Sequence, residues 1–356
     1  MQVQKQAGDP APQRPDRYKL EFTGSGREYF RIWIVNLLLS IITLGIYSAW
    51  AKVRTNQYFY RCVKLDNSGF DYHGSPLAIL KGRIIAVAMI AALNIAPQVH
   101  LGLYLVLLVM FLIMLPWLVT RSLAFRMHNS SWRSIRFRFR GSVGEAATCF
   151  YAYGLLTMIT LGVAYPLQFW KIQKFTFDNT SFGKTGFSFK STLTDVYKIF
   201  ALTFLFVLIL VIGFMIVMGI TATGAESLKQ DKGQAGIIAM AYVMVMYAGI
   251  IIVIYPFFKA KITNLIWNNV ALGGVSFTST ITVRKYFTVI AGNLVLTILT
   301  LGLYWPWALV KIIRMRMDYL ELTAPAGLDT FAADLSEDVG AAGEEITSAF
   351  DFDISF

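Results

Sequence analysis

Polar side chains inside long apolar segments are the residues of this sequence best suited to chemistry. An amide or hydroxyl group without a hydrogen-bond partner costs several kcal/mol in lipid, so such groups face protein or water. They could frame a polar path for a solute, as in transporters built from discontinuous helices. Alternatively, they hydrogen-bond neighbouring helices or cap breaks within them. The candidates are Asn36, Thr43, Asn94, Thr160, Asn293 and Thr300.

Sequence motifs of enzymes are mostly absent. The chain has no phosphate-binding loop, no His-Glu-x-x-His zinc motif and no Gly-x-Ser-x-Gly elbow. Its three histidines, His73, His100 and His128, fall in different loops and are poorly placed to share a metal. Cys62 and Cys149 are too few for a thiolate metal site. We therefore expect no enzymatic activity, no metal and no cofactor.

Composition places the chain in a membrane. Of its 356 residues, 56% are hydrophobic and 15% are charged, and the mean hydropathy is +0.56. Soluble domains contain about 25% charged residues. Four apolar stretches are long enough to cross a hydrocarbon core of about 30 Å, and they form two hairpins. These stretches are Leu77 to Pro97, Leu101 to Thr120, Ile199 to Thr221 and Ile237 to Phe258.

Three further apolar segments contain Thr-Leu-Gly at their centre, at residues 43–45, 160–162 and 300–302. Glycine permits the positive φ of a sharp turn, and proline suits the first turn of a returning helix. Matched positions around the motif indicate a repeated structural unit. The motif positions are Gly45, Tyr47, Trp50, Gly162, Pro166, Gly302, Tyr304, Pro306 and Trp307.

Short alternating runs extend the repeat beyond the apolar segments. Phe137, Phe187 and Phe277 lie in such runs, and each follows an asparagine by eight residues. Alternation of apolar and polar residues predicts short strands. We expect them to form a small β-rich cap on the cytoplasmic side of three repeats, at about residues 18–76, 134–191 and 273–322.

The combination of an F-x-G strand, an asparagine, TLG-x-Y-x-x-W and a basic helix resembles the YjgN-like family of bacterial inner-membrane proteins, also called domain of unknown function 898. The likeness covers roughly Tyr18 to Leu322, and the segments TLGIYSAWAKVR and TLGLYWPWALVK carry it best. The middle copy, TLGVAYPLQFWK, has one inserted residue before its tyrosine and lacks the tryptophan five residues after the glycine. The resemblance implies a multi-pass protein of the inner membrane and supplies no activity.

Basic residues flank both ends of every Thr-Leu-Gly segment, whereas the two hairpin tips are electrically neutral. Because positively charged loops stay in the cytoplasm, this pattern favours re-entrant helix-turn-helix units that start and finish there. Hydropathy alone favours seven ordinary spans, since the segment from Phe30 to Trp50 is long enough to cross. Both interpretations stand at this point.

Charge also divides the chain into regions. The net charge is +11, but no Lys or Arg follows Arg316 and the last 40 residues hold ten acids. We expect a flexible N-terminus at 1–17, a membrane domain at 18–322 and an acidic tail at 323–356. The partners predicted for the basic loops are the lipid bilayer and its anionic lipids. We expect no nucleic acid to bind, because no recognition motif accompanies the charge; any protein partner is open.

The sequence thus predicts an α-helical polytopic membrane protein with three internal Thr-Leu-Gly repeats, two transmembrane hairpins and a small β-rich cytoplasmic cap. The first functional hypothesis is a transporter or channel for a small solute. The second is a membrane scaffold that binds a lipid or a partner without transport.

Overall fold

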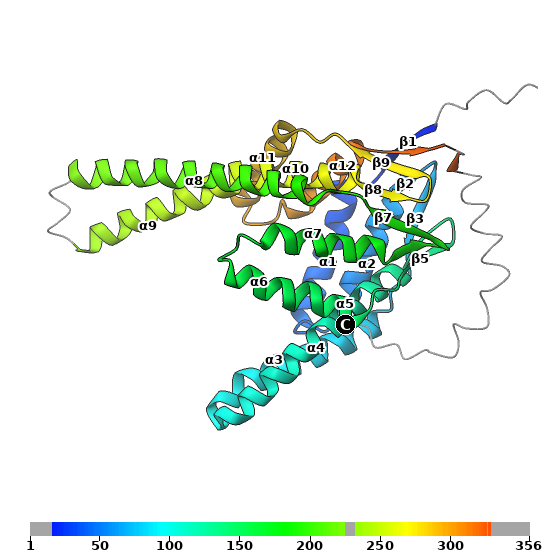
Figure 1. Cartoon of the computed structure of the whole chain (residues 1–356), viewed down its shortest axis with the longest axis horizontal. Helices are drawn as coiled ribbons and strands as arrows, with labels where there is room; N and C mark the ends of the chain where they lie inside the picture. Colours follow the sequence, from blue (N-terminus) through cyan, green and yellow to red (C-terminus); the bar gives the residue numbers. More distant parts are fainter. Residues whose placement is uncertain (1–15, 225–231, 326, 329–356) are drawn as a thin grey trace, which may run out of the picture.

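The computed structural model describes residues 16–224, 232–325 and 327–328. In these ranges the order strand, helical hairpin, strand occurs five times along the chain (Figure 1). The strands are β1 Asp16–Phe22, β2 Val63–Leu65, β3 Ser68–Tyr72, β4 Ser130–Trp132, β5 Ile135–Phe139, β6 Thr180–Phe182, β7 Thr185–Phe189, β8 Val270–Leu272, β9 Val275–Ser279 and β10 Leu320–Ala324.

The helices between the two strands of each unit form the hairpins. The first unit holds α1 Gly26–Ile42 and α2 Ser48–Cys62, and the second holds α3 Pro76–Val99 and α4 Leu101–His128. The third holds α5 Val143–Ala147, a π-helical turn Thr148–Ala152, α6 Tyr153–Ile159 and α7 Tyr165–Asp178. The fourth holds α8 Leu193–Gly224, α9 Lys232–Gly249, a π-helical turn Ile250–Ile254 and α10 Tyr255–Asn268, and the fifth holds α11 Val283–Leu299 and α12 Trp305–Asp318.

The ten strands in the described ranges close into an antiparallel barrel of order β1-β10-β9-β8-β7-β6-β5-β4-β3-β2. Neighbouring units are joined by two-residue turns, and both residues of the turns Asp66-Asn67 and Arg133-Ser134 have positive φ. Such turns match the twist of a tight β-hairpin. β1 and β10 come from opposite ends of the chain, and their pairing closes the barrel.

Within each unit the two strands pair, and the helical hairpin leaves from the end of the first strand and returns to the start of the second. An equivalent backbone hydrogen bond of 2.8 to 3.1 Å fixes this junction in all five units. The N–H groups of Thr23, His73, Arg140, Lys190 and Thr280 donate to the carbonyl oxygens of Cys62, Asn129, Asn179, Asn269 and Tyr319, respectively. All five hairpins therefore leave the barrel at the same end.

A serine or threonine caps the first helix of every unit. Its hydroxyl oxygen accepts a hydrogen bond from the backbone N–H three residues later, which satisfies a donor that the helix leaves free. The caps are Ser25, Ser75, Ser142, Thr192 and Thr282. This polar residue stops each strand and starts each helix at the same place in the unit.

The chain reverses direction at each Thr-Leu-Gly. The leucines have φ of 48° to 51°, and the glycines have φ of 90° to 93°. Each glycine N–H donates to a carbonyl five residues earlier, as in a Schellman turn. Both ends of these three hairpins join barrel strands, which is the geometry expected of the re-entrant alternative.

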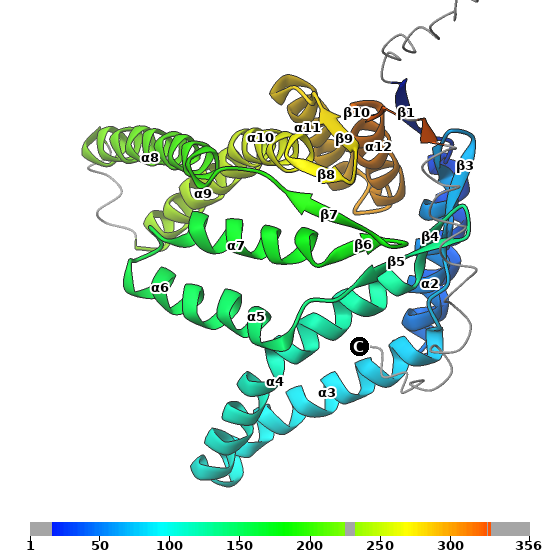
Figure 2. The ribbon, with the colours of Figure 1, turned by 45° about the vertical axis from the view of Figure 1, so that its right-hand side comes forward.

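The hairpins form a closed ring that extends from the helix-bearing end of the barrel (Figures 1 and 2). The second helix of each unit contacts the first helix of the next, and α12 contacts α1. Four helical stretches in the described residues are long and apolar enough to cross a membrane: Pro76–Val99, Leu101–His128, Leu193–Gly219 and Met240–Asn268. These correspond to the two long hairpins predicted from hydropathy.

The predicted fold class is wrong. The strands do not form a small cap on an α-helical protein with three repeats, because they close a ten-stranded barrel from which five hairpins project. The second and fourth units were not predicted as repeats, because their long hairpins lack Thr-Leu-Gly. The predicted flexible N-terminus and acidic tail lie largely outside the described residues, but Asp16 and Arg17 belong to β1 and pair with Ala324 and Thr323 of β10.

Candidate functional site

Five pairs of directly opposed side chains line the middle of the barrel, one pair in each unit. Every strand contributes one residue, and all ten are leucine, phenylalanine or tryptophan. The pairs are Leu20–Leu65, Phe70–Trp132, Phe137–Phe182, Phe187–Leu272 and Phe277–Leu322. Because alternate residues of a strand face the same side, one position per strand is enough to build a continuous apolar ring.

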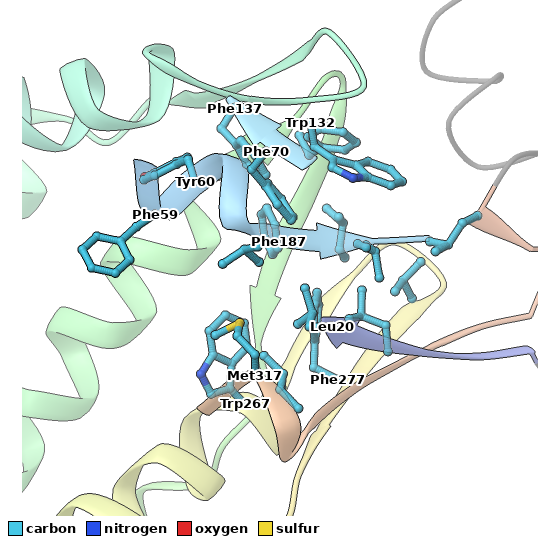
Figure 3. Close-up of a pocket in the computed structure, with 18 residues that line it drawn as sticks. Leu20, Phe59, Tyr60, Phe70, Trp132, Phe137, Phe187, Trp267, Phe277 and Met317 are labelled. Atoms are coloured by element: carbon cyan, nitrogen blue, oxygen red, sulfur yellow. The ribbon is translucent and has the colours of Figure 1, made fainter. Parts of the chain in front are cut away.

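The ring surrounds a cavity of about 440 Å³ (Figure 3). The end toward the helices is lined by Phe59, Tyr60, Trp267 and Met317, which lie near the C-terminal ends of α2, α10 and α12. At the opposite end Leu328, which follows β10, packs into the cavity and is 2% exposed. Its N–H donates to the Tyr18 hydroxyl over 3.4 Å.

Two polar atoms of the lining have protein partners. The Tyr60 hydroxyl accepts a hydrogen bond from Ser130 Oγ over 3.0 Å, and Trp132 Nε1 donates to the Ser68 carbonyl over 3.2 Å. The lining residues in the described ranges include no carboxylate, amine, imidazole or thiol. A cavity lined in this way suits an apolar molecule, because a buried polar group would find no hydrogen-bond partner there.

The aromatic members of the ring contact one another around the barrel. The ring centroids of Phe137 and Phe182 are 4.9 Å apart, and those of Trp132 and Phe182 are 6.0 Å apart. Phe187 lies between Phe137 and Phe277, with centroid distances of 6.3 and 6.5 Å. These spacings fall in the favourable range for aromatic pairs, so the lining is an ordered surface.

The asparagines predicted for a polar path hold hairpin helices together. Asn293 Nδ2 donates to the Ala308 carbonyl over 3.1 Å, and Asn36 Nδ2 donates to the Ala51 carbonyl over 3.5 Å. Asn94 donates to Ile90 of its own helix over 2.8 Å. None of the three lines the barrel cavity.

The threonines of the motif cap the turns. Thr43, Thr160 and Thr300 each donate to a carbonyl four residues earlier over 2.7 Å. Each also accepts from a backbone N–H four residues later, over 2.9 to 3.0 Å. The structure places the six predicted residues on four hairpins, where each makes hydrogen bonds within its own hairpin. A polar path through them stays a prediction.

The remaining motif residues shape the returning helices. Tyr47 stacks on Trp50 and Tyr304 stacks on Trp307, with centroid distances of 6.2 and 5.9 Å. Pro166 and Pro306 are buried at the start of α7 and α12. In the described residues no three His, Cys, Asp or Glu side chains lie close enough together to hold a metal ion.

One thiol lies beside the helix-facing end of the barrel. Burial raises the pKa of Cys62, although hydrogen bonds with Tyr58 and Thr23 offset part of that effect. Burial also raises the pKa of Tyr58, whose hydroxyl donates to the Ser25 carbonyl over 3.0 Å. Both groups are therefore neutral at physiological pH, in keeping with the apolar cavity next to them.

Three of the lining residues, Phe137, Phe187 and Phe277, were predicted from the sequence only as repeat positions. A signal for the whole ring was present. A phenylalanine follows a large apolar residue by five positions across each inter-unit turn, as in Trp132 and Phe137. The other three instances are Leu65–Phe70, Phe182–Phe187 and Leu272–Phe277.

Comparison with known proteins gives one family. A family model described as "Bacterial protein of unknown function (DUF898)" matches residues 17–349. Inner membrane protein YjgN of Salmonella typhimurium (strain LT2) is 25% identical over 363 residues, which cover 86% of this chain and 91% of that protein. Inner membrane protein YjgN of Escherichia coli (strain K12) is 24% identical over 219 residues, covering 52% of this chain and 55% of that protein. No solved structure matches the chain.

Proposed function

This protein belongs to the DUF898 family of bacterial proteins of unknown function, and we propose that it binds the acyl chain of a lipid inside its barrel. The resemblance predicted from the Thr-Leu-Gly motifs is confirmed, and so is the predicted place of the protein in the bacterial inner membrane. The family brings no activity with it, so the proposal depends on the geometry of this chain.

The apolar cavity is the observation that supports this function. Its volume of about 440 Å³ lies within the range of about 300 to 1,000 Å³ typical of small-molecule sites. A free fatty acid that left water for such a site would gain about 25 cal/mol per Å² of apolar surface buried. A polar solute would lose its hydration and find no partner in the lining. The ligand is therefore a hydrocarbon.

The position of the cavity points to a membrane lipid as the source of that hydrocarbon. Its helix-facing end is lined by Phe59, Tyr60, Trp267 and Met317, and the apolar hairpins start at the same end. Leu328 packs at the opposite end. An acyl chain that entered at this end would be surrounded inside the cavity by leucine, valine, methionine and aromatic side chains.

This proposal develops the second functional hypothesis, that of a protein which binds lipid without transport. A transporter for a small polar solute has less support, because Asn36 and Asn293 are engaged with helix carbonyls. A binding role without catalysis also suits a lining that holds no carboxylate, amine, imidazole or thiol. Anionic lipid remains the partner we propose for basic loops such as those that hold Arg140 and Lys190.

Photochemical crosslinking tests the proposal. We would add palmitic acid bearing a diazirine in its chain to the protein in phosphatidylcholine nanodiscs, irradiate it and locate the label by peptide mass spectrometry. We expect labelling of peptides that contain Phe187 and Phe277, and competition by unmodified palmitate. Label confined to the long hairpins, or label that excess palmitate does not reduce, would contradict a site in the barrel.

Two variants of strand β9 give a matched comparison. Val275 lines the cavity, whereas Thr278 is exposed on the same strand. Val275→Trp fills part of the cavity and should reduce labelling of the barrel several-fold, while Thr278→Trp should leave it unchanged. Thermal unfolding of both variants checks folding, and Leu20→Trp repeats the test from β1 if Val275→Trp does not fold. Equal labelling of a folded cavity variant and the control overturns the proposal.

A further inference from the structure

The second helix of every unit carries a cation at one equivalent position. In each case the cation follows a buried proline or alanine by five residues. That small residue is the second residue of its helix in four units, whereas Pro116 lies within α4. The pairs are Ala49 and Arg54, Pro116 and Arg121, Pro166 and Lys171, Pro256 and Lys261, and Pro306 and Lys311. Four of the five cations are exposed, and Lys171 is half-buried. We call these five side chains the cation belt.

The cation belt points away from the cavity. The cavity-lining residues Tyr60, Trp267 and Met317 each follow a belt residue by six positions. Six residues rotate a helix by about 600°, so the two side chains differ in direction by about 120°. The belt lies about 9 Å along the helices from the barrel mouth.

Aromatic rings accompany the belt. Arg121 lies over the Trp117 ring at 6.0 Å, Lys171 over Trp170 at 5.2 Å and Lys311 over Tyr304 at 5.2 Å. Basic residues together with tryptophan and tyrosine mark the level of lipid headgroups, where long cationic side chains reach polar surroundings. An excess of Lys and Arg marks the cytoplasmic side.

We infer that the cation belt sits in the headgroups of the cytoplasmic leaflet and that the three Thr-Leu-Gly hairpins end near the middle of the bilayer. Nine residues separate Gly302 from Lys311, and the same spacing holds for Gly45 and Arg54 and for Gly162 and Lys171. At 1.5 Å per residue these hairpins reach about 14 Å beyond the belt, half of a hydrocarbon core of about 30 Å.

The long hairpin α3/α4 provides the comparison within the same molecule. From Arg121 back to its tip at His100 there are 21 residues, or about 32 Å of helix. This length crosses the whole hydrocarbon core. Measured from the cation belt, the long hairpins therefore cross the whole hydrocarbon core, whereas the short hairpins reach about half of its thickness.

The tips of the short hairpins have the surface that this depth requires. Leu44, Leu161 and Leu301 are 94%, 94% and 95% exposed, and they stand among other exposed apolar residues such as Ile42 and Met158. Patches of this kind mark contact with a partner or a membrane. The partner of these tips is the acyl-chain region of the cytoplasmic leaflet. This inference is independent of any ligand in the barrel.

Single-cysteine reporters test the depth. In a Cys62→Ala, Cys149→Ala background we would place Leu301→Cys, Val99→Cys and Thr278→Cys and label them with a membrane-impermeant maleimide, in intact cells and in inside-out vesicles. We expect Val99→Cys to react only in intact cells, Thr278→Cys only in inside-out vesicles and Leu301→Cys in neither. A spin label at Leu301→Cys should then be relaxed by oxygen and shielded from a nickel chelate.

Each other result overturns the inference. Reaction of Leu301→Cys in intact cells means that the hairpin crosses the membrane. Reaction in inside-out vesicles, or relaxation by the nickel chelate, means that the tip stays in water or headgroups. If Val99→Cys does not react in intact cells, the long hairpin does not cross the membrane. Leu301 is almost fully exposed, so its replacement removes no packing, and Leu44→Cys repeats the measurement on another hairpin.

Discussion

Asn293 and Ala308 join the two helices of the last hairpin, because Asn293 Nδ2 donates to the Ala308 carbonyl oxygen over 3.1 Å. Asn36 makes the equivalent contact to Ala51 in the first hairpin. Both asparagines are 5% exposed. A carbonyl of a helix already accepts one bond within the helix, so the amide uses its second lone pair without breaking the ladder. The contact is therefore a link between helices that leaves each helix intact.

Replacement of Asn293 by leucine should destabilise the protein. The change removes a buried hydrogen bond but leaves the Ala308 carbonyl its bond within the helix, so we expect a cost of about 0.5 to 1.5 kcal/mol. We expect a lower midpoint of thermal unfolding in detergent and unchanged crosslinking of palmitate in the barrel. Asn94→Leu is the control, because Asn94 bonds only within its own exposed helix. An Asn293→Leu protein that unfolds at the same temperature as the Asn94→Leu control would show that this contact does not hold the hairpin together.

Two glycines of the same hairpin should respond to alanine in opposite directions. Gly302 has φ +90°, whereas Gly292 lies within α11, and neither position has an atom within 4 Å of an added Cβ. Gly302→Ala strains the backbone and should cost about 1 to 2 kcal/mol. Gly292→Ala restricts only the unfolded chain and should gain about 0.5 to 1 kcal/mol. The measurement is the thermal unfolding midpoint of the two variants. If both midpoints shift in the same direction by the same amount, the turn geometry is contradicted.

Local structure was predictable where short-range physics decides it. The turn at Thr-Leu-Gly follows from a glycine that must take positive φ and a threonine that caps both helices. The strands around Phe137, Phe187 and Phe277 follow from alternation. The long hairpin α3/α4 follows from length and hydropathy. Each of these features depends on residues that are close together in the sequence.

Closure of the barrel depends on pairing between residues that are far apart in the sequence. β1 and β10 pair although about 300 residues separate them, and neither strand is longer than seven residues. The five-unit order was hidden because the units differ in hairpin length. In the long hairpins, the buried Pro116 and Pro256 stand at the position that Pro306 occupies in the last unit. That shared proline is the signal that could have revealed the two long units.

Cys62 should react slowly with alkylating reagents. Its pKa is raised, chiefly by burial, so less thiolate is present at a given pH than for a free cysteine. We expect the rate of reaction with iodoacetamide at pH 7.4 to be lower than that of Thr278→Cys in a Cys62→Ala, Cys149→Ala background. The rate for Cys62, measured in a Cys149→Ala protein, should keep rising at pH values where the exposed control has levelled off. Equal rates and equal pH profiles would show that Cys62 is accessible and unperturbed.

Leu328 should contribute to stability as a core residue, although it lies after the last strand. Its side chain packs with Leu20, Leu322 and other buried residues of the barrel, and only 2% of it is exposed. Leu328→Ala removes apolar contacts and leaves a larger cavity, and such changes cost about 2 to 5 kcal/mol. The expected result is a clear fall in the thermal midpoint in detergent. Leu301→Ala is the matched control, because this leucine is 95% exposed and its truncation should change stability by less than about 0.5 kcal/mol. A Leu328→Ala protein as stable as the control would mean that the residues after β10 do not close the barrel, and the cavity would then be open at both ends.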